Sequence, residues 1–162
     1  MSYDLEDAEL DFLDSAPIRI AHEETVRAPI AAVWQAVSDP AAWVEWFPKV
    51  KECGWTSAET RCVGSTRTIR IGPASFDERF IEWDEDTMRF HFTVTRTSLP
   101  IANRMVEGAA LTDNGDGTVT VTWRSAIEPR TALIPKGMIR QSFEKGLARG
   151  FAGLEDYLDG ST

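Results

Sequence analysis

The chain has 162 residues, the size of one ordinary domain, and such a domain can fold without disulfides or metal. Its formal net charge of −9 argues against nucleic acid as the main partner and against a peripheral anchor on anionic lipid, because both need a basic surface. The first 16 residues hold six of the 26 acidic residues and none of the 17 basic ones, which leaves a net charge of −3 for the rest.

The acidic arm, residues 1–16, has two open interpretations. One is a solvated tail without fixed structure. The other is a short helix that docks through Leu10, Phe12 and Leu13. We therefore divide the chain into this arm and a single domain, residues 17–162, and we leave the role of the arm open.

A strand and two short helices are expected next. Alternation over residues 18–27 indicates a strand. Pro29 stands where the first residue of a helix favours proline, and apolar residues at helical spacing follow it up to residue 37. Asp39 and Pro40 supply the N-cap and first position of a second short helix, about Ala41 to Trp46.

From residue 50 to residue 128 the hydrophobic period is near two, which indicates antiparallel strands. We expect them at residues 50–56, 63–71, 75–83, 88–95, 103–112 and 119–128. Residues 133–158 then show apolar positions three and four apart over roughly seven turns, which predicts one long amphipathic helix. Gly146, Gly150 and Gly153 interrupt it, either for close packing or to leave room for a ligand.

These elements predict an α+β protein in which a curved antiparallel sheet of about seven strands wraps around a long C-terminal helix, with two short helices after the first strand. A helix with one apolar stripe must bury that stripe against the sheet. Large sheets curl, and side chains do not always fill the space inside them. The sequence therefore indicates a cavity between the sheet and the helix.

Four segments carry a family resemblance: Glu24–Pro48, with its Trp-rich second half, Gly64–Gly72, Asp77–Asp84 and Gly117–Arg124. In this order and spacing they resemble the START/SRPBCC superfamily of helix-grip proteins, and most closely its polyketide cyclase/dehydrase-like branch. The resemblance covers nearly all of the chain from Ile18 to Leu158. It implies a deep apolar pocket for lipids, sterols, polyketides or hormones, but it implies no single chemistry.

The candidate ligand-binding residues combine inward strand positions with aromatic and helical positions near the expected pocket. They are Trp43, Phe47, Arg67, Ile69, Ile71, Glu78, Phe80, Phe90, Phe92, Met105, Glu107, Trp123, Phe143 and Leu147. For each of them, ordinary core packing or a surface position is the alternative. The resemblance places Trp43 and Phe47 where aromatase/cyclases have pocket aromatics.

Three charged residues stand out on strands with apolar neighbours. Glu78 has the same strand parity as Phe76 and Phe80, and its Glu-Arg-Phe run resembles the Glu-Arg-Leu run of plant abscisic-acid receptors, where the glutamate faces the ligand. Glu107 is expected to face inward too. Arg67 shares the parity of the inward isoleucines, so it can neutralise Glu78 or bind a ligand carboxylate.

No residue pattern indicates a metal, a cofactor or a covalent nucleophile. His91 should lie outside, opposite in parity to Phe90 and Phe92. Cys53 and Cys62 are either two reduced thiols or a cross-strand disulfide. Because the N-terminus is acidic where a signal peptide is basic, and because no apolar run is long enough to span a membrane, we expect a cytoplasmic protein.

These observations favour non-covalent binding or transport of a hydrophobic small molecule by a monomer or homodimer. The first alternative is a cyclase-like enzyme that uses a pocket carboxylate as base. Where the resembling cyclases carry a tyrosine, this chain has Val50, which cannot transfer protons. The second alternative is an interaction module that acts through the acidic arm, or an arm that covers the mouth of the pocket.

Overall fold

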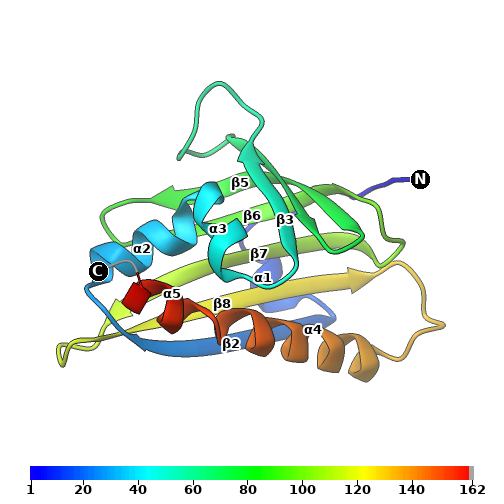
Figure 1. Cartoon of the computed structure of the whole chain (residues 1–162). Coiled ribbons are helices and arrows are strands. Elements are labelled where there is room, and N and C mark those ends of the chain that lie inside the picture. Colours follow the sequence, from blue (N-terminus) through cyan, green and yellow to red (C-terminus); the bar gives the residue numbers. More distant parts are fainter. Residues whose placement is uncertain (161–162) are drawn as a thin grey trace.

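The computed structural model describes residues 1–160, and its centre is a curled antiparallel sheet that grips a C-terminal helix (Figure 1). The main strands follow the order β2-β8-β7-β6-β5-β4-β3. They are β2 (Ile18–Arg27), β3 (Val50–Trp55), β4 (Thr66–Ile71), β5 (Ala74–Asp84), β6 (Arg89–Thr97), β7 (Ala102–Asp113) and β8 (Thr118–Pro129). The predicted helix-grip architecture is confirmed.

The two short helices after β2 are α2 (Ile30–Ser38) and α3 (Pro40–Trp46), as expected. The Asp39 side chain accepts a hydrogen bond from the backbone N–H of Ala41 at 3.0 Å, so it caps α3 as predicted. Indole N–H groups then fix the helix pair, because Trp43 donates to the Val37 carbonyl and Trp46 to the Ala36 carbonyl, both at 2.9 Å. These helices close one end of the space inside the sheet.

The C-terminal segment is two helices, α4 (Lys136–Phe151) and α5 (Leu154–Gly160), instead of the one continuous helix that the periodicity predicted. A Cβ at Gly153 would lie 2.7 Å from the backbone oxygen of Trp46, and a Cβ at Gly150 would overlap the ring of Phe47. Both glycines therefore let α3 approach closely. At Gly146, in contrast, a Cβ would meet no atom within 4 Å.

Two strands begin later than the pattern indicated. The expected strand 63–71 starts at Thr66, because residues 56–65 form a longer loop than the predicted four-residue turn. The strand expected at residues 88–95 also starts one residue later, because Met88 has a positive φ of 53° and β6 begins at Arg89. A bulge in β5 between Phe80 and Glu82 places Ile81 on the outer face and brings Trp83 into the inner core.

The acidic arm packs against the outer face of the sheet, so the solvated-tail interpretation is wrong. Its β1 (Tyr3–Asp4) pairs with β6, and the backbone N–H groups of Leu5 and Glu6 donate to the carbonyls of Thr95 on β6 and Asn103 on β7. The arm thus bridges β6 and β7 beyond the point where those two strands are directly paired.

A short helix, α1 (Phe12–Ser15), completes the docking of the arm. Phe12 and Leu13 are buried against Val106 and Ala126, while Leu10 remains exposed, contrary to expectation. The acids of the arm are held by arginines of the sheet in three ion pairs: Asp4 with Arg96, Asp7 with Arg79 and Asp14 with Arg124. The same layer helps to cover the outer face of β6, where His91 lies outside as predicted but is only 6% exposed.

Candidate functional site

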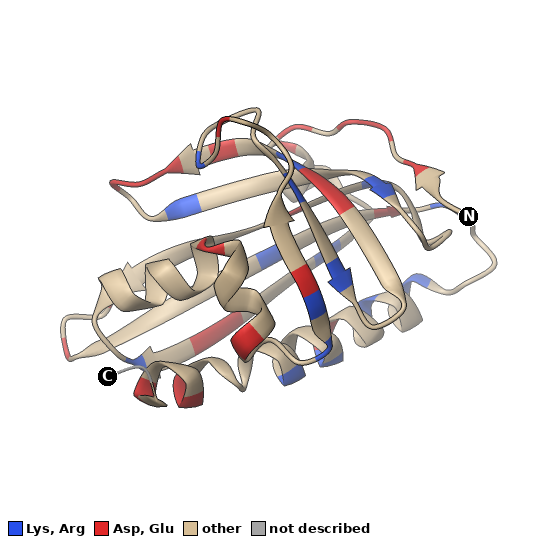
Figure 2. Ribbon diagram, turned by 45° about the horizontal axis from the view of Figure 1, so that its top comes forward, with Lys and Arg blue, Asp and Glu red and all other residues tan. Residues whose placement is uncertain are grey.

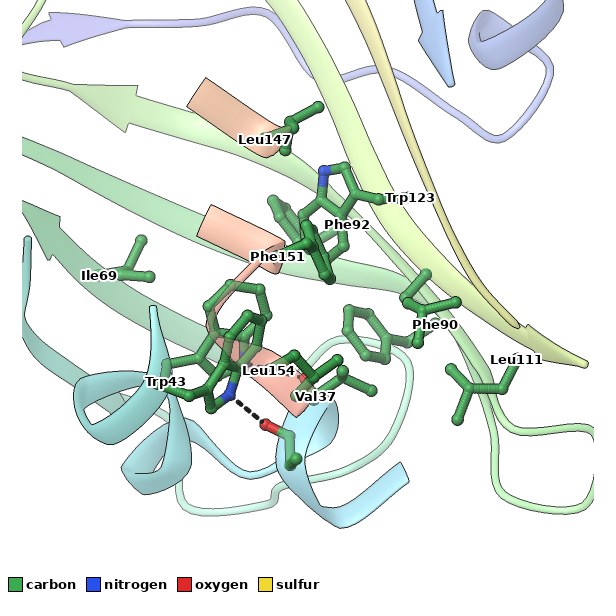
Figure 3. Close-up of a cluster of buried hydrophobic side chains, with 14 of the residues drawn as sticks. Val37, Trp43, Ile69, Phe90, Phe92, Leu111, Trp123, Leu147, Phe151 and Leu154 are labelled. Atoms are coloured by element: carbon green, nitrogen blue, oxygen red, sulfur yellow. Dashed lines mark hydrogen bonds between the residues drawn. The ribbon is translucent and has the colours of Figure 1, made fainter. Parts of the chain in front are cut away.

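A cavity of about 260 Å³ lies between the inner face of the sheet, α3 and α4. Aromatic side chains from α3, from α4 and from the sheet converge beside it. Figure 3 shows four of them, Trp43, Phe92, Trp123 and Phe151, between the helices and the strands. Trp43 contacts Trp123 at a ring-centroid distance of 5.5 Å, and Trp123 contacts Phe151 at 5.8 Å. The wall is therefore predominantly apolar.

Most of the candidate residues from the sequence line this cavity. They are Trp43, Phe47, Arg67, Ile69, Ile71, Glu78, Phe92, Met105, Glu107, Trp123, Phe143 and Leu147. Phe80 and Phe90 do not line it. They pack with Trp83 instead, at ring-centroid distances of 5.0 and 5.3 Å, because Trp34 and Trp83 fill that end of the sheet.

The sequence reasoning missed four wall residues as ligand-contact candidates: Phe76, Ser142, Gly146 and Phe151. A signal existed for three of them, but not for Ser142. Phe76 shares the strand parity of Glu78, and Phe151 belongs to the apolar stripe of α4. Gly146 is the helix glycine with open space at its Cβ, which matches the idea of room beside the helix.

Arg67 and Glu78 form an ion pair inside the cavity wall. Nε of Arg67 donates to Oε2 of Glu78 at 2.6 Å, Nη2 of Arg67 lies 2.6 Å from the same oxygen, and the two side chains are 2% and 5% exposed. The strand pairing causes this contact, because Arg67 of β4 stands directly opposite Glu78 of β5. The predicted neutralisation of Glu78 by Arg67 is therefore present in the structure.

The Arg67 guanidinium also lies near three aromatic rings and keeps one unused donor. Its central carbon is 5.1 Å from the Phe80 ring centroid, 5.2 Å from that of Phe92 and 5.8 Å from that of Trp43. Among the buried side-chain nitrogens and oxygens of residues 1–160, Nη1 of Arg67 alone has no hydrogen-bond partner. A buried donor without a partner costs free energy, so this atom is a natural contact for an acceptor oxygen.

Glu107 is the second carboxyl group of the cavity. Its Oε2 accepts hydrogen bonds from the Trp123 indole at 2.9 Å and from the Ser125 hydroxyl at 2.5 Å. The side chain is half-buried because it retains exposure toward the cavity, yet protein surrounds it. Both carboxyl groups therefore line one largely apolar cavity with a single cation, Arg67.

This arrangement raises the pKa values of both carboxyl groups. Burial raises the pKa of Glu78 to about 7, although the Arg67 charge and its hydrogen bonds act in the opposite direction. Burial also raises the pKa of Glu107 despite the hydrogen bonds from Ser125 and Trp123. A carboxyl group with a pKa near neutrality can take up and release a proton at working pH.

The described residues offer no metal site, since 1–160 contain no group of three or more ligand-type side chains that could hold an ion. Cys53 and Cys62 are free thiols in the structure, not a disulfide. Among the same residues, no helix is long and apolar enough to cross a membrane. The recognisable chemistry of the site is thus an arginine, two carboxyl groups and an apolar wall.

Solved structures support the helix-grip class. A START superfamily protein from Mycobacterium smegmatis superposes with a TM-score of 0.76 at 14% identity, over 89% of this chain and 99% of that one. The ginseng major latex-like protein 151 from Panax ginseng gives 0.73 at 16% identity, over 86% and 96%. The di-domain ARO/CYC BexL of the BE-7585A biosynthetic pathway gives 0.73 at 19% identity, over 88% of this chain and 46% of BexL. At these identities the likeness shows the fold.

The family follows from the sequence itself. Residues 17–159 match the family described as polyketide cyclase / dehydrase and lipid transport, and the chain belongs to this family. The expected superfamily and branch are confirmed. A curated relative, the uncharacterized protein Rv2574 of Mycobacterium tuberculosis, is 30% identical over 97 residues, which are 59% of this chain and 58% of that protein. This chain therefore spans less than two thirds of the relative.

Proposed function

We propose that the protein binds a compact hydrophobic small molecule in the cavity between the sheet and α4. The observation that carries this proposal is a largely apolar cavity whose buried Arg67 retains a free donor, Nη1. Apolar walls with a few fixed polar groups are the usual design of small-molecule sites. The wall supplies affinity, and Arg67, Glu78 and Glu107 orient the ligand.

The size and polarity of the cavity narrow the class of ligand. Its volume of about 260 Å³ is near the lower limit of common ligand sites, which measure roughly 300–1,000 Å³. A ligand of one or a few fused rings fits this space better than a long-chain lipid. Nη1 of Arg67 calls for one acceptor oxygen on the ligand, such as a carbonyl or carboxylate.

A cyclase- or dehydratase-like reaction is the second candidate, and one observation favours it. Glu78 has a pKa of about 7, which suits a general acid or base at neutral pH. Arg67 beside it can polarise a ligand carbonyl, and Glu107 can exchange a second proton. An enzyme of this kind would lose turnover in Glu78→Gln while it retained ligand binding.

A cavity-filling substitution tests binding directly. A Cβ at Gly146 meets no protein atom within 4 Å, and the residue lines the cavity, so we expect the side chain of Gly146→Leu to occupy ligand space. Gly137 is the matched control, because it lies in the same helix with equally open space but outside the cavity wall. Both substitutions should favour the helix by about 1 kcal/mol.

Native mass spectrometry of the wild type and both variants, purified from the same cells, gives the readout. We expect a discrete bound mass on the wild type and on Gly137→Leu and none on Gly146→Leu, with thermal stability retained in both variants. Equal adducts on all three proteins would place the ligand elsewhere. A wild type without any bound mass would contradict a stably bound ligand.

A further inference from the structure

The start of α4 and the loop before it expose an unusual concentration of large apolar side chains. Leu133 is 91% exposed, Met138 61% and Ile134 44%. Seven large hydrophobic side chains are exposed among residues 1–160, and these three fall within six positions of one another. Isolated exposed apolar residues need no explanation, but a cluster is typical of a binding surface.

The same segment is basic, although the chain as a whole is acidic. Residues 130–149 contain five basic residues and one acidic residue, a local net charge of +4 in a chain of −9. Lys136, Arg140, Lys145 and Arg149 all lie on α4, and none of them forms an ion pair with another described residue. This contrasts with the arginines on the outer face of the sheet, which hold the acids of the arm.

The acidic arm and the basic helix α4 thus lie on opposite sides of the sheet, although α5 next to α4 carries Glu155 and Asp156, and Arg130 donates to the Asp4 carbonyl of the arm. The acidic arm covers the outer face, while α4 packs on the inner side, and Figure 2 shows the blue segments of α4 well apart from the red segments of the arm. A charge distribution of this kind orients a molecule as it approaches a charged surface. The basic side would face an anionic surface even though the total charge is negative.

The α4 surface also adjoins the cavity. Ser142, Phe143 and Gly146 line the cavity, and Met138 lies one turn before Ser142 on the same helix. Most of the first ten residues of α4 are exposed, with only Ile139 and Phe143 half-buried among them. An apolar ligand that enters beside this part of α4 would cross the same surface.

We propose that the surface formed by Leu133, Ile134 and Met138 together with Lys145 and Arg149, which lie on the same side of α4 as Met138, docks on an anionic lipid bilayer. The apolar side chains would enter the boundary between headgroups and acyl chains, and the cations would pair with headgroup phosphates. The positive charge of α4 favours an anionic partner such as lipid phosphate. The exposed apolar side chains favour a bilayer over a purely polar polyanion, because only a bilayer offers an apolar interior. This inference goes beyond ligand binding, because it assigns the surface by which the protein contacts a lipid bilayer. Apolar ligands accumulate in the bilayer.

Vesicle sedimentation of the full chain tests the docking. Neutral vesicles of phosphatidylcholine are compared with equimolar phosphatidylcholine and phosphatidylglycerol, at low and at high salt. We expect binding to the anionic vesicles at low salt, little to the neutral ones, and release by salt. Loss of two cations alone corresponds to about thirtyfold weaker binding, so the double variant Lys145→Glu with Arg149→Glu should lose at least this much. Leu133→Ser with Met138→Ser should also weaken binding at an unchanged charge.

The matched control is Arg19→Glu with Lys51→Glu, which changes the net charge equally at exposed positions outside α4. It should retain more of the binding than the α4 variant. Three results would overturn the proposal: no binding of the wild type to anionic vesicles, equal loss in both charge variants, or a dimer in solution that only the α4 variant dissociates, which assigns the surface to a second copy. Because vesicle binding requires no ligand, its failure leaves the native mass experiment as an independent test of the cavity.

Discussion

The buried Arg67–Glu78 pair makes a quantitative prediction about stability and pH. Glu78 has a pKa of about 7 in the folded chain against an ordinary value of 4.5. The folded state therefore binds more protons than the unfolded state between these two values, and the contribution of Glu78 to stability falls as the pH rises through that window. The shift of about 2.5 pH units corresponds to about 3 kcal/mol.

Glu78→Gln removes the titration and retains an oxygen that can accept from Arg67. Relative to the wild type, the variant should therefore gain about 3 kcal/mol of unfolding free energy between pH 4.5 and pH 7, and the difference should then level off. At acidic pH the protonated wild-type carboxyl group and the amide are nearly equivalent. At neutral pH only the wild type must bury a carboxylate in an apolar wall.

Urea unfolding of both proteins across this pH range measures the difference, and the comparison cancels every other titrating group. Glu52→Gln is the control, because Glu52 pairs with Arg70 at the surface, where the pair is well solvated. Its difference from the wild type should stay flat. A flat difference for Glu78→Gln as well would mean that Glu78 is ionised throughout, and this would refute the argument that burial outweighs the Arg67 charge.

Three further predictions follow from the same contacts. Phe12→Ala should lower the unfolding free energy by about 3 kcal/mol in thermal or urea unfolding, because Phe12 fixes the arm to the outer face. Leu10→Ala, at an exposed position of the same arm, should change the unfolding free energy little. Equal effects of the two substitutions would argue that the arm is not docked in solution. The carboxylate probe 2-naphthoate should bind more tightly at pH 6 than at pH 8 by fluorescence titration, because protonation of Glu78 frees the Arg67 charge, and the opposite trend would contradict the raised pKa of Glu78. Desolvation raises the pKa of the half-buried Cys53 thiol to about 12, so in a Cys62→Ser variant Ellman's reagent should label Cys53 slowly at pH 8 in the native chain and rapidly in urea, and fast native labelling would contradict the raised pKa.

Strand parity predicted much of the site, because alternate residues of a half-buried strand must face the same side. Phe92, Glu107 and Trp123 lie on the wall for this reason. Strand parity could not tell which inward-facing residues line the cavity and which pack in the solid core, because both groups lie on the inner face of the sheet. Phe90 shares the parity of Phe92, but the rings of Trp34 and Trp83 reach it and fill the space.

Other features depend on contacts between distant segments, which no local pattern encodes. The period of the C-terminal segment is helical throughout, yet α4 ends at Phe151 and α5 begins at Leu154, and between them Gly153 lies where a Cβ would be 2.7 Å from the backbone oxygen of Trp46. The docking of the arm likewise requires a small-residue surface at Val106 and Ala126 on strands far away in the sequence. The bulge at Ile81 depends on the register between β5 and β6.

The most direct test of the central claim uses the indole N–H signals in nuclear magnetic resonance spectra. Trp43 and Trp123 lie on the cavity wall, while Trp34 and Trp83 donate to Glu85 at the other end of the core. On titration with 2-naphthoate, the indole signals of Trp43 and Trp123 should shift with one common dissociation constant, and those of Trp34 and Trp83 should stay nearly fixed. Shifts confined to Trp34 and Trp83, or no shifts at saturating concentrations, would contradict a ligand site between the sheet and α4.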